Sequence, residues 1–414
     1  MDPIPLSLPF LMDGATGTEL QKRGMPLGAC TEQWALEHPE ALLELQRAYV
    51  EAGAQVLVTP TLGANRGALE KFGLADRVEE YNARLTGLTR QAAAGRALVA
   101  GDLGPTLHAI PPYGETPFEV LVGFYAEQAA ALERAGVDLF LVESVMAMAE
   151  ARAAVLGIRE SGSRRPILVT CYCDEEGRTP SGTDVLACAI VMQGMGVTAF
   201  GFNCVDPAVA EEQLARLHLY TDLPLIAEPS AGLPDLASGK PDYPDNADAF
   251  ARRTPQWAAA GVRIFGGCCG TAPAHIAALG RAMATVDFSA FPPVEKDPDV
   301  IPCASEKEAR FITPDVDVGE TIQCTDHLME DILEAEEERP VGALKIEVLD
   351  TDDLEIFARE QYAVRDALCL WSDVPELLEG ALRAYQGRAF YDGTAELEPE
   401  FLARMSEKYG LILL

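Results

Sequence analysis

The sequence has few basic residues. Its 414 residues include 65 Asp and Glu but 32 Lys and Arg, which gives a formal net charge of −33 at pH 7. Phosphate backbones and anionic lipid surfaces repel so negative a chain. We therefore expect neither a nucleic acid nor a membrane among its partners.

Long apolar runs and a secretory leader are also missing. No apolar run approaches the roughly 20 residues that a membrane-spanning helix needs. The start, Met1 to Pro3, lacks the basic region and apolar core of a signal peptide. We expect a soluble cytoplasmic protein whose ten cysteines are mostly reduced. Closely spaced cysteines then point to metal binding or catalysis sooner than to disulfides.

The acidic excess is unevenly distributed along the chain. Residues 287–414 hold 31 acidic and 11 basic side chains, a net of −20, whereas residues 1–286 have a net of −13. This asymmetry predicts two modules, at 1–286 and 313–414. Between them, residues 287–312 are rich in proline and charge and are predicted to form a linker.

The first module alternates between buried-strand patterns and amphipathic helix patterns. We predict strands at 9–12, 55–59, 97–101, 138–143, 166–172, 197–203, 224–228 and 262–266. We predict helices at 39–52, 77–94, 117–135, 147–160, 183–193, 207–217, 247–260 and 272–285. Eight such pairs indicate a (β/α)₈ barrel of the TIM type. The alternative, a doubly wound sheet, is disfavoured because no glycine-rich fingerprint follows the first strand.

The second module is predicted to be a small acidic α/β unit. Strand patterns lie at 343–348, 367–371, 388–391 and 411–414, and helix patterns at 325–338, 352–363, 374–385 and 399–409. The last strand either completes a small sheet or pairs with something outside this sequence.

Two cysteine motifs follow predicted barrel strands. GFNC (201–204) ends at Cys204 after the sixth strand, and GGCCG (266–270) holds Cys268 and Cys269 after the eighth. Both strands open onto the same face of a barrel, so the three side chains can converge. Three thiolates suit tetrahedral Zn²⁺ and leave a fourth position exchangeable, as in catalytic zinc sites.

The cysteines also allow other interpretations. Cys268 and Cys269 could be small buried residues or a vicinal disulfide. Cys171 and Cys173, at the end of the fifth strand, are expected to pack rather than bind metal. A scaffold protein with a structural zinc and a thiol redox protein are the two competing functional classes.

Taken together, these motifs resemble those of the zinc-dependent homocysteine S-methyltransferases over roughly residues 8–286. This family includes betaine–homocysteine methyltransferase, S-methylmethionine-dependent enzymes and the homocysteine-binding module of cobalamin-dependent methionine synthase. Besides GFNC and GGCCG, the matching motifs are MDGATGTEL (12–20), TPTLGAN (59–65), GDLGPT (101–106), VES (142–144) and EPSAGLP (228–234). The resemblance implies that Cys204, Cys268 and Cys269 bind zinc, and that the enzyme methylates the thiol of L-homocysteine to give methionine.

The substrate's amino-acid end also needs partners. Asp13 and Glu143 end the first and fourth strands and are expected to pair with the α-ammonium, as the resemblance supports. The competing roles are a helix cap for Asp13 and a solvated rim carboxylate for Glu143. Asn203 and Asn65 are candidate hydrogen-bonding or turn residues. Backbone amides are expected to receive the carboxylate; they belong to Gly14, Thr16, Gly17 and Thr18. No catalytic side chain is expected beyond the zinc-activated substrate thiolate.

Residues 369–414 show a weaker resemblance, to part of the folate-binding barrel of methionine synthases. The module is too short to be that whole barrel. The resemblance favours a methylated corrinoid, on a separate protein, as the methyl donor, with betaine and S-methylmethionine as alternatives. The sequence leaves an oligomer open.

Overall fold

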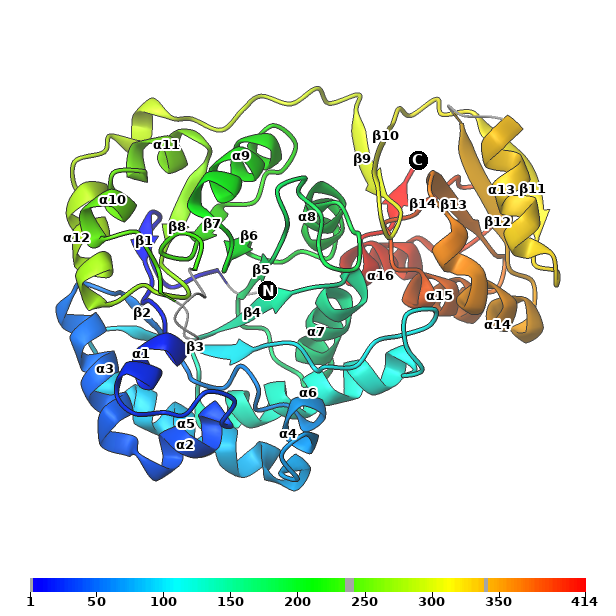
Figure 1. The fold of residues 1–414 in the computed structure, drawn as a ribbon. Helices are drawn as coiled ribbons and strands as arrows, with labels where there is room; N and C mark the ends of the chain where they lie inside the picture. The colour runs from blue at the N-terminus through cyan, green and yellow to red at the C-terminus, as the bar shows by residue number, and fades with distance from the viewer. Residues whose placement is uncertain (1–2, 235–241, 339–341) are drawn as a thin grey trace.

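The computed structural model describes residues 3–234, 242–338 and 342–414 (Figure 1). Its first part is a barrel of eight parallel strands in the order β1-β8-β7-β6-β5-β4-β3-β2. A parallel bridge between Met12 and Val56 and a 2.7 Å hydrogen bond from the Gln55 amide to the Leu11 carbonyl bring β2 back to β1. The predicted (β/α)₈ barrel is therefore confirmed.

The barrel elements fall close to the predicted ranges. Strands β1–β8 span Phe10–Leu11, Val56–Val58, Leu98–Leu103, Leu139–Val145, Ile167–Cys171, Ala199–Asn203, Leu225–Glu228 and Val262–Phe265. Helices α1–α12 span Gly17–Lys22, Thr31–Glu37, Pro39–Glu51, Arg66–Glu70, Val78–Ala93, Phe118–Ala135, Met148–Glu160, Val185–Gly194, Pro207–His218, Ala247–Ala251, Thr254–Ala259 and Pro273–Met283.

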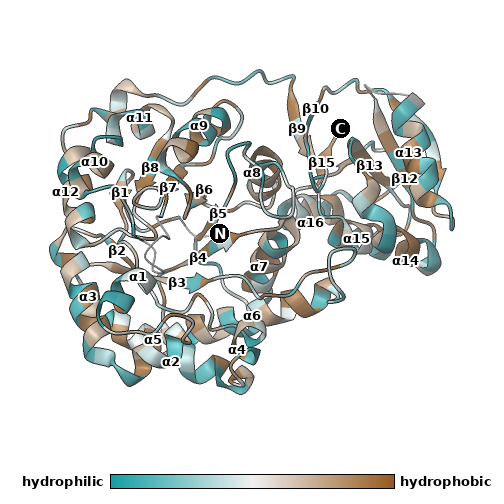
Figure 2. Cartoon of the chain, in the orientation of Figure 1, coloured by the Kyte–Doolittle hydropathy of each residue, from teal (hydrophilic) through white to brown (hydrophobic). Residues whose placement is uncertain are grey.

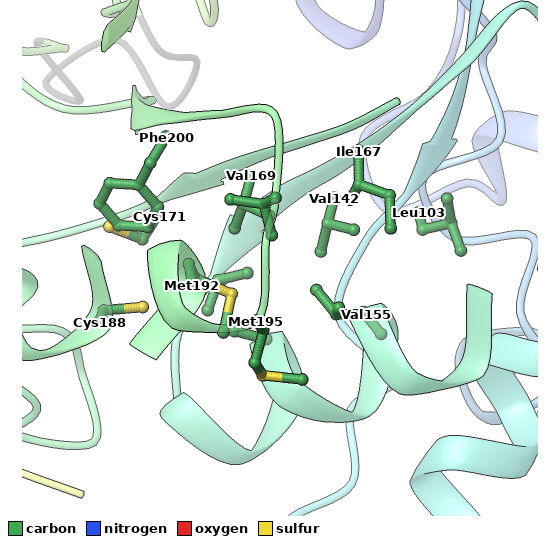
Figure 3. Packing of buried hydrophobic residues seen from close by; sticks show 14 of the residues in the cluster. Leu103, Val142, Val155, Ile167, Val169, Cys171, Cys188, Met192, Met195 and Phe200 are labelled. Carbon is green, nitrogen blue, oxygen red and sulfur yellow. The ribbon is translucent and has the colours of Figure 1, made fainter. Parts of the chain in front are cut away.

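The apolar strands bury both faces. Residues on one face, such as Phe10, Leu141 and Ile264, fill the barrel interior. On the other face, Val142 and Val169 meet helical side chains of the surrounding layer (Figure 3). The helices carry apolar and polar residues together (Figure 2), as expected for elements with one face on the barrel and one on solvent. The two-residue side-chain period of a strand explains this division.

Some helices differ from the predicted pattern. The predicted helix at 247–260 is split into α10 and α11, because Pro255 removes a backbone donor and clashes with the carbonyl four residues earlier. Helices α1, α2 and α4 were not predicted. They have six, seven and five residues, too few for a helical period to show in the sequence.

The C-terminal module is a five-stranded parallel sheet preceded by a hairpin. Hairpin strands β9 and β10 span Ile301–Ala304 and Ala309–Ile312, so the stretch predicted as a linker ends in ordered structure. Strands β11–β15 span Val318–Gln323, Ala343–Glu347, Ala367–Trp371, Phe390–Tyr391 and Ile412–Leu413, and neighbour one another in that order. Helices α13–α16 span Leu328–Glu338, Thr351–Glu360, Pro375–Ala384 and Pro399–Tyr409. The last strand completes this sheet by pairing with β14.

The hairpin covers one face of that sheet. Cys303 and Ile312 of the hairpin pack with Ala367, Cys369 and Phe390 of the strands. Residues of the opposite strand faces join the core cluster that includes the helices. A parallel sheet is normally covered on both faces, and here the hairpin supplies the second cover.

Helix α7 of the barrel lies against the C-terminal module (Figure 1). Arg152 is fully buried and donates to the carbonyls of Leu382 (2.8 Å) and Arg383 (3.2 Å) near the end of α15. Arg159 donates to the carbonyls of Glu407 and Lys408 at 3.2 Å, near the end of α16. Carbonyls in the last turn of a helix have no partner within the helix, so these arginines satisfy them.

Among the residues that the structure describes, no helix is long and apolar enough to cross a membrane.

Candidate metal centre and substrate cavity

Three cysteines meet at the carboxyl-terminal mouth of the barrel. Cys204 directly follows β6, and Cys268 and Cys269 lie between β8 and α12. Their sulfurs all lie within 4.8 Å of one another, and this is the one such group of three metal-ligating side chains in the described ranges. The Cys269 sulfur lies 3.3 Å from that of Cys204 and 4.0 Å from that of Cys268.

The donor set fits zinc. Ligands at the usual Zn–S distance of about 2.3 Å are separated by about 3.8 Å in a tetrahedral site, close to two of the observed separations. Cys204 and Cys268 are joined as a disulfide in this structure, so metal binding requires reduction of that pair. Burial raises the pKa of Cys269, and a hydrogen bond with Tyr243 opposes that rise by favouring the thiolate.

The local backbone explains the motif around these cysteines. Cys204 adopts a left-handed conformation with φ of 56°, which is uncommon for a residue with a side chain. Gly270 has φ of 83°, and a Cβ there would lie 2.2 Å from the Tyr243 ring. A Cβ on Gly267 would lie 2.6 Å from the Thr271 hydroxyl oxygen. The glycines thus allow the tight path that turns both cysteines toward Cys204.

A cavity of about 210 Å³ adjoins the cysteines and is rich in carboxylates. Residues Gly14 to Thr18 form part of its wall, and its described lining residues include no Lys, Arg or His. Five carboxylates also line it, those of Asp13, Glu32, Asp102, Glu143 and Glu228. The cavity therefore suits a small ligand that carries a positive charge.

Asp13 and Glu143 both face this cavity. The Asp13 carboxylate accepts a 3.0 Å hydrogen bond from the Val58 amide, and burial raises its pKa well above the usual range. Glu143 lies beside the three cysteines, with Oε1 3.8 Å from the Cys268 sulfur. Burial raises the pKa of Glu143 to about 7, against the opposing effect of hydrogen bonds to Asn203 and Asp102.

Asn203 lies behind the cavity wall and contacts Glu143 and Ser144, which line the cavity. It is fully buried and absent from the cavity wall. Its Nδ2 donates to Glu143 Oε1 at 2.8 Å and to Ser144 Oγ at 2.7 Å, while its Oδ1 accepts from the Ser144 amide at 3.0 Å. Ser144 is itself left-handed, with φ of 61°. The Asn203 side chain is thus occupied in holding the end of β4.

The other asparagine and cysteine candidates lie away from the cavity. Asn65 caps α4, with Oδ1 accepting from the Ala68 amide at 2.8 Å. Cys171 and Cys173 are buried and do not line the cavity, which agrees with the predicted packing role.

The segment predicted to bind the carboxylate, residues 14–18, runs into the start of α1. Thr16, Gly17 and Thr18 lie in the first turn, whose amides have no acceptor within the helix. The Ala15 amide is already used, because it donates to the Thr271 hydroxyl at 3.1 Å. The Thr18 hydroxyl accepts from the Gly270 amide at 3.1 Å, which ties this turn to the cysteine loop.

Sequence reasoning did not single out Glu32, Asp102, Glu228 or Tyr243. Asp102 Oδ1 and Glu228 Oε2 are buried without a hydrogen-bond partner in the part of the chain that the structure describes. Burial raises the pKa of both carboxyls, and repulsion from Glu143 adds to the rise. A signal was present, since both residues lie near strand ends within the GDLGPT and EPSAGLP motifs.

The comparisons with known proteins concern the barrel. The family model described as homocysteine S-methyltransferase matches residues 10–283. Methionine synthase from Mycobacterium tuberculosis is 31% identical over 292 residues, which cover 66% of this chain and 24% of that protein. Methionine synthase from Mycobacterium leprae is 31% identical over 302 residues, 69% of this chain and 25% of that one. The chain thus spans about a quarter of the length of these curated relatives.

Among solved structures, this chain is similar to homocysteine methyltransferase MmuM from Escherichia coli. The metallated form is 30% identical with a TM-score of 0.56, covering 66% of this chain and 95% of that one. The oxidized form is 28% identical, with the same TM-score and coverage. Since the family model covers more than half of the sequence, including all three converging cysteines, the chain belongs to the homocysteine S-methyltransferase family.

Proposed function

We propose that this protein transfers a methyl group to the sulfur of L-homocysteine to form methionine, with zinc held by Cys204, Cys268 and Cys269. The observation that carries this proposal is the convergence of three sulfurs at a small cavity lined by carboxylates. Its volume of about 210 Å³ is smaller than the roughly 300–1,000 Å³ of most ligand pockets, which favours a small amino acid.

The chemistry requires a nucleophilic sulfur. A free thiol has a pKa near 8.5 and is mostly protonated at neutral pH. Cys204, Cys268 and Cys269 would hold the zinc, and the ion would supply the positive charge that keeps the substrate sulfur as a thiolate. Buried cysteines with raised pKa values, such as Cys269, would become thiolates on binding the metal.

The chain's own residues orient the substrate. Asp13 and Glu143 receive its α-ammonium, and Asn203 keeps Glu143 in place through the 2.8 Å hydrogen bond. The amides of the first turn of α1, together with Gly14, receive its carboxylate. This leaves the sulfur directed toward the cysteines and holds it for attack on the donor's methyl group.

For the donor, we propose a methylated corrinoid on a separate protein. The similarity to methionine synthases and the resemblance of residues 369–414 to a folate-binding barrel support this choice. A small donor such as S-methylmethionine or betaine is the second candidate. The size of MmuM favours it, because this barrel matches 95% of that chain, so a homocysteine methyltransferase of this family can consist of little more than the barrel.

We further propose that residues 313–414 act as a structural remnant of a folate barrel. Five parallel strands are present, and the hairpin covers one sheet face. A complete barrel of this kind has eight strands.

A donor panel tests the proposal. Reduced, zinc-loaded full-length protein is given homocysteine with methylcobalamin, S-methylmethionine, betaine or methyltetrahydrofolate, and methionine is measured. Cys204→Ala should abolish product and lower bound zinc, whereas Cys188→Ala, a buried cysteine of α8, should retain both. Wild-type protein that binds zinc but forms no methionine with any donor would contradict the proposal. Unfolding on zinc removal would instead favour the scaffold class, and activity of Cys204→Ala the redox class.

A further inference from the structure

The tip of the β9–β10 hairpin is inserted between loops at the mouth of the barrel. We propose that Lys307, in this tip, is a positioning residue that fixes the rim on which the methyl donor docks. The inference rests on the proposed methylation of homocysteine, and it gives the C-terminal module a role in the barrel's activity.

Contacts at the tip are polar and well buried. Lys307 is 19% exposed, and its ammonium donates to the Ser181 carbonyl at 2.8 Å and to Glu306 Oε1 at 2.7 Å. The Lys307 carbonyl accepts from the Asp184 amide at 2.9 Å. Next to it, Glu308 pairs with Arg178 at 2.9 Å. The β5–α8 loop is therefore tied to the hairpin at three positions, Arg178, Ser181 and Asp184.

The same ammonium reaches a second barrel loop. It lies 4.5 Å from the ring centroid of Tyr113, within the range of a cation–π interaction. Tyr113 belongs to the long loop between β3 and α6, which is separate in sequence from the β5–α8 loop. One lysine thus holds two loops of the barrel mouth together.

Ser181 links the Lys307 contact to the residue that follows β4, close to the substrate cavity. The Ser181 residue whose carbonyl Lys307 binds donates its amide to the Met146 carbonyl at 3.1 Å. In the same region, the Tyr172 amide donates to the Val145 carbonyl at 3.1 Å. Met146 lies two residues after Ser144, which lines the cavity. Loosening the tip would therefore loosen the rim outside the cavity, while Asn203 still holds Glu143 and Ser144 at the cavity wall.

The loops held in this way expose large apolar side chains. Tyr113 is 57% exposed, Met146 42% and Tyr172 39%, and they come from the loops after β3, β4 and β5, which are neighbouring strands. Below the cavity, the barrel interior is filled with apolar side chains, so a donor can approach only from the rim. An exposed apolar edge is suited to receive it, provided that the loops keep their positions.

The test compares Lys307→Ala and Lys307→Arg in the full chain with Lys296→Ala as a matched control. Lys296 lies on the same connecting segment, is 23% exposed and pairs with Asp222 at 2.8 Å, which lies in the α9–β7 loop. Hydrogen exchange of residues 105–116 and 172–184 is measured first, because it needs no activity. Lys307→Ala should speed exchange in both loops about tenfold, as expected when one charge-assisted hydrogen bond that orders a loop is lost. Lys307→Arg should restore most of the protection, and Lys296→Ala should leave it unchanged.

The kinetic arm uses methylcobalamin and S-methylmethionine as donors and zinc-loaded protein. Lys307→Ala should raise the KM for the active donor about tenfold, while kcat and the homocysteine Kd change less than about twofold. Unchanged exchange would overturn the positioning role. A parallel loss of homocysteine affinity, or an unchanged donor KM despite faster exchange, would overturn the donor role. A wild-type protein inactive with every donor would refute the proposed function and the donor role with it, while the exchange result would still decide the positioning role.

Discussion

Replacing Arg152 with methionine should loosen the C-terminal module from the barrel. The buried guanidinium makes three hydrogen bonds, to the carbonyls of Leu382 and Arg383 and to Gln386 Oε1, at 2.8, 3.2 and 3.2 Å. Hydrogen bonds to a charged group contribute about 2 kcal/mol each when one partner is removed, or about 6 kcal/mol here. Methionine fills much of the space but leaves the two helix-end carbonyls without a donor.

The gain from removing a buried charge offsets part of this loss. Burial lowers the pKa of Arg152 to about 10. Relative to an ordinary value near 12.5, that change corresponds to about 3 kcal/mol of unfavourable burial. The net destabilisation expected for Arg152→Met is therefore about 3 kcal/mol.

Urea unfolding, followed by circular dichroism, measures this difference, and hydrogen exchange in α15 locates it. Arg152→Lys should fall between wild type and Arg152→Met, because it keeps the charge but loses the planar fork that reaches several acceptors. Arg359→Met is the control, since Arg359 is exposed and pairs with the adjacent Glu360, and its unfolding midpoint should not move. A loss below about 1 kcal/mol for Arg152→Met would refute the reasoning that these hydrogen bonds dock the module.

Three further predictions concern the cavity. Unfolded chains release the Glu143 proton near pH 4.5, but the folded protein holds it to about pH 7, so the stability of metal-free reduced protein should fall as pH rises between these values. Urea midpoints at pH 5.5 and 7.5 check this, and Glu143→Gln should reduce the difference. Asn203→Ala should raise the homocysteine KM about tenfold, because it removes the hydrogen bond that holds Glu143; an unchanged KM would contradict the assigned role. Gly270→Ala should lower zinc affinity, measured by competition with a chelator, since a Cβ at that position meets the Tyr243 ring; unchanged affinity would argue against a strained cysteine loop.

The barrel could be predicted because its strands are buried on both faces and read as apolar runs followed by helices with glycine ends. The C-terminal module was harder. Strand β11 reads VGETIQ, an edge strand with a glycine and exposed polar residues, which resembles a loop in the sequence. The hairpin lies in a stretch whose prolines and charges indicate a linker, and its burial depends on a sheet formed by later residues.

The candidate metal centre could also be predicted only in part. Adjacent cysteines between glycines are rare enough to indicate chemistry, and barrel topology then brings Cys204 to them. Asn203, by contrast, sits beside Cys204 in the sequence, yet its side chain faces the protein interior and holds Glu143. The direction of the Asn203 side chain depends on the left-handed residues Ser144 and Cys204, and no periodic pattern in the sequence reveals such residues.

Some of the chain's acidic residues lie inside the barrel and not on its surface. Most acidic residues are solvated, but Asp13, Asp102 and Glu228 are almost fully buried around one cavity, and burial raises the pKa of each. Such groups destabilise the empty barrel, because each must either stay protonated or lose hydration without a counter-charge. A ligand that brings an ammonium group, with a divalent metal beside it, supplies the missing positive charge. Binding should therefore stabilise the folded protein more than its contact area suggests. The same cluster disfavours small anions and favours a ligand whose ammonium group can enter among the carboxylates.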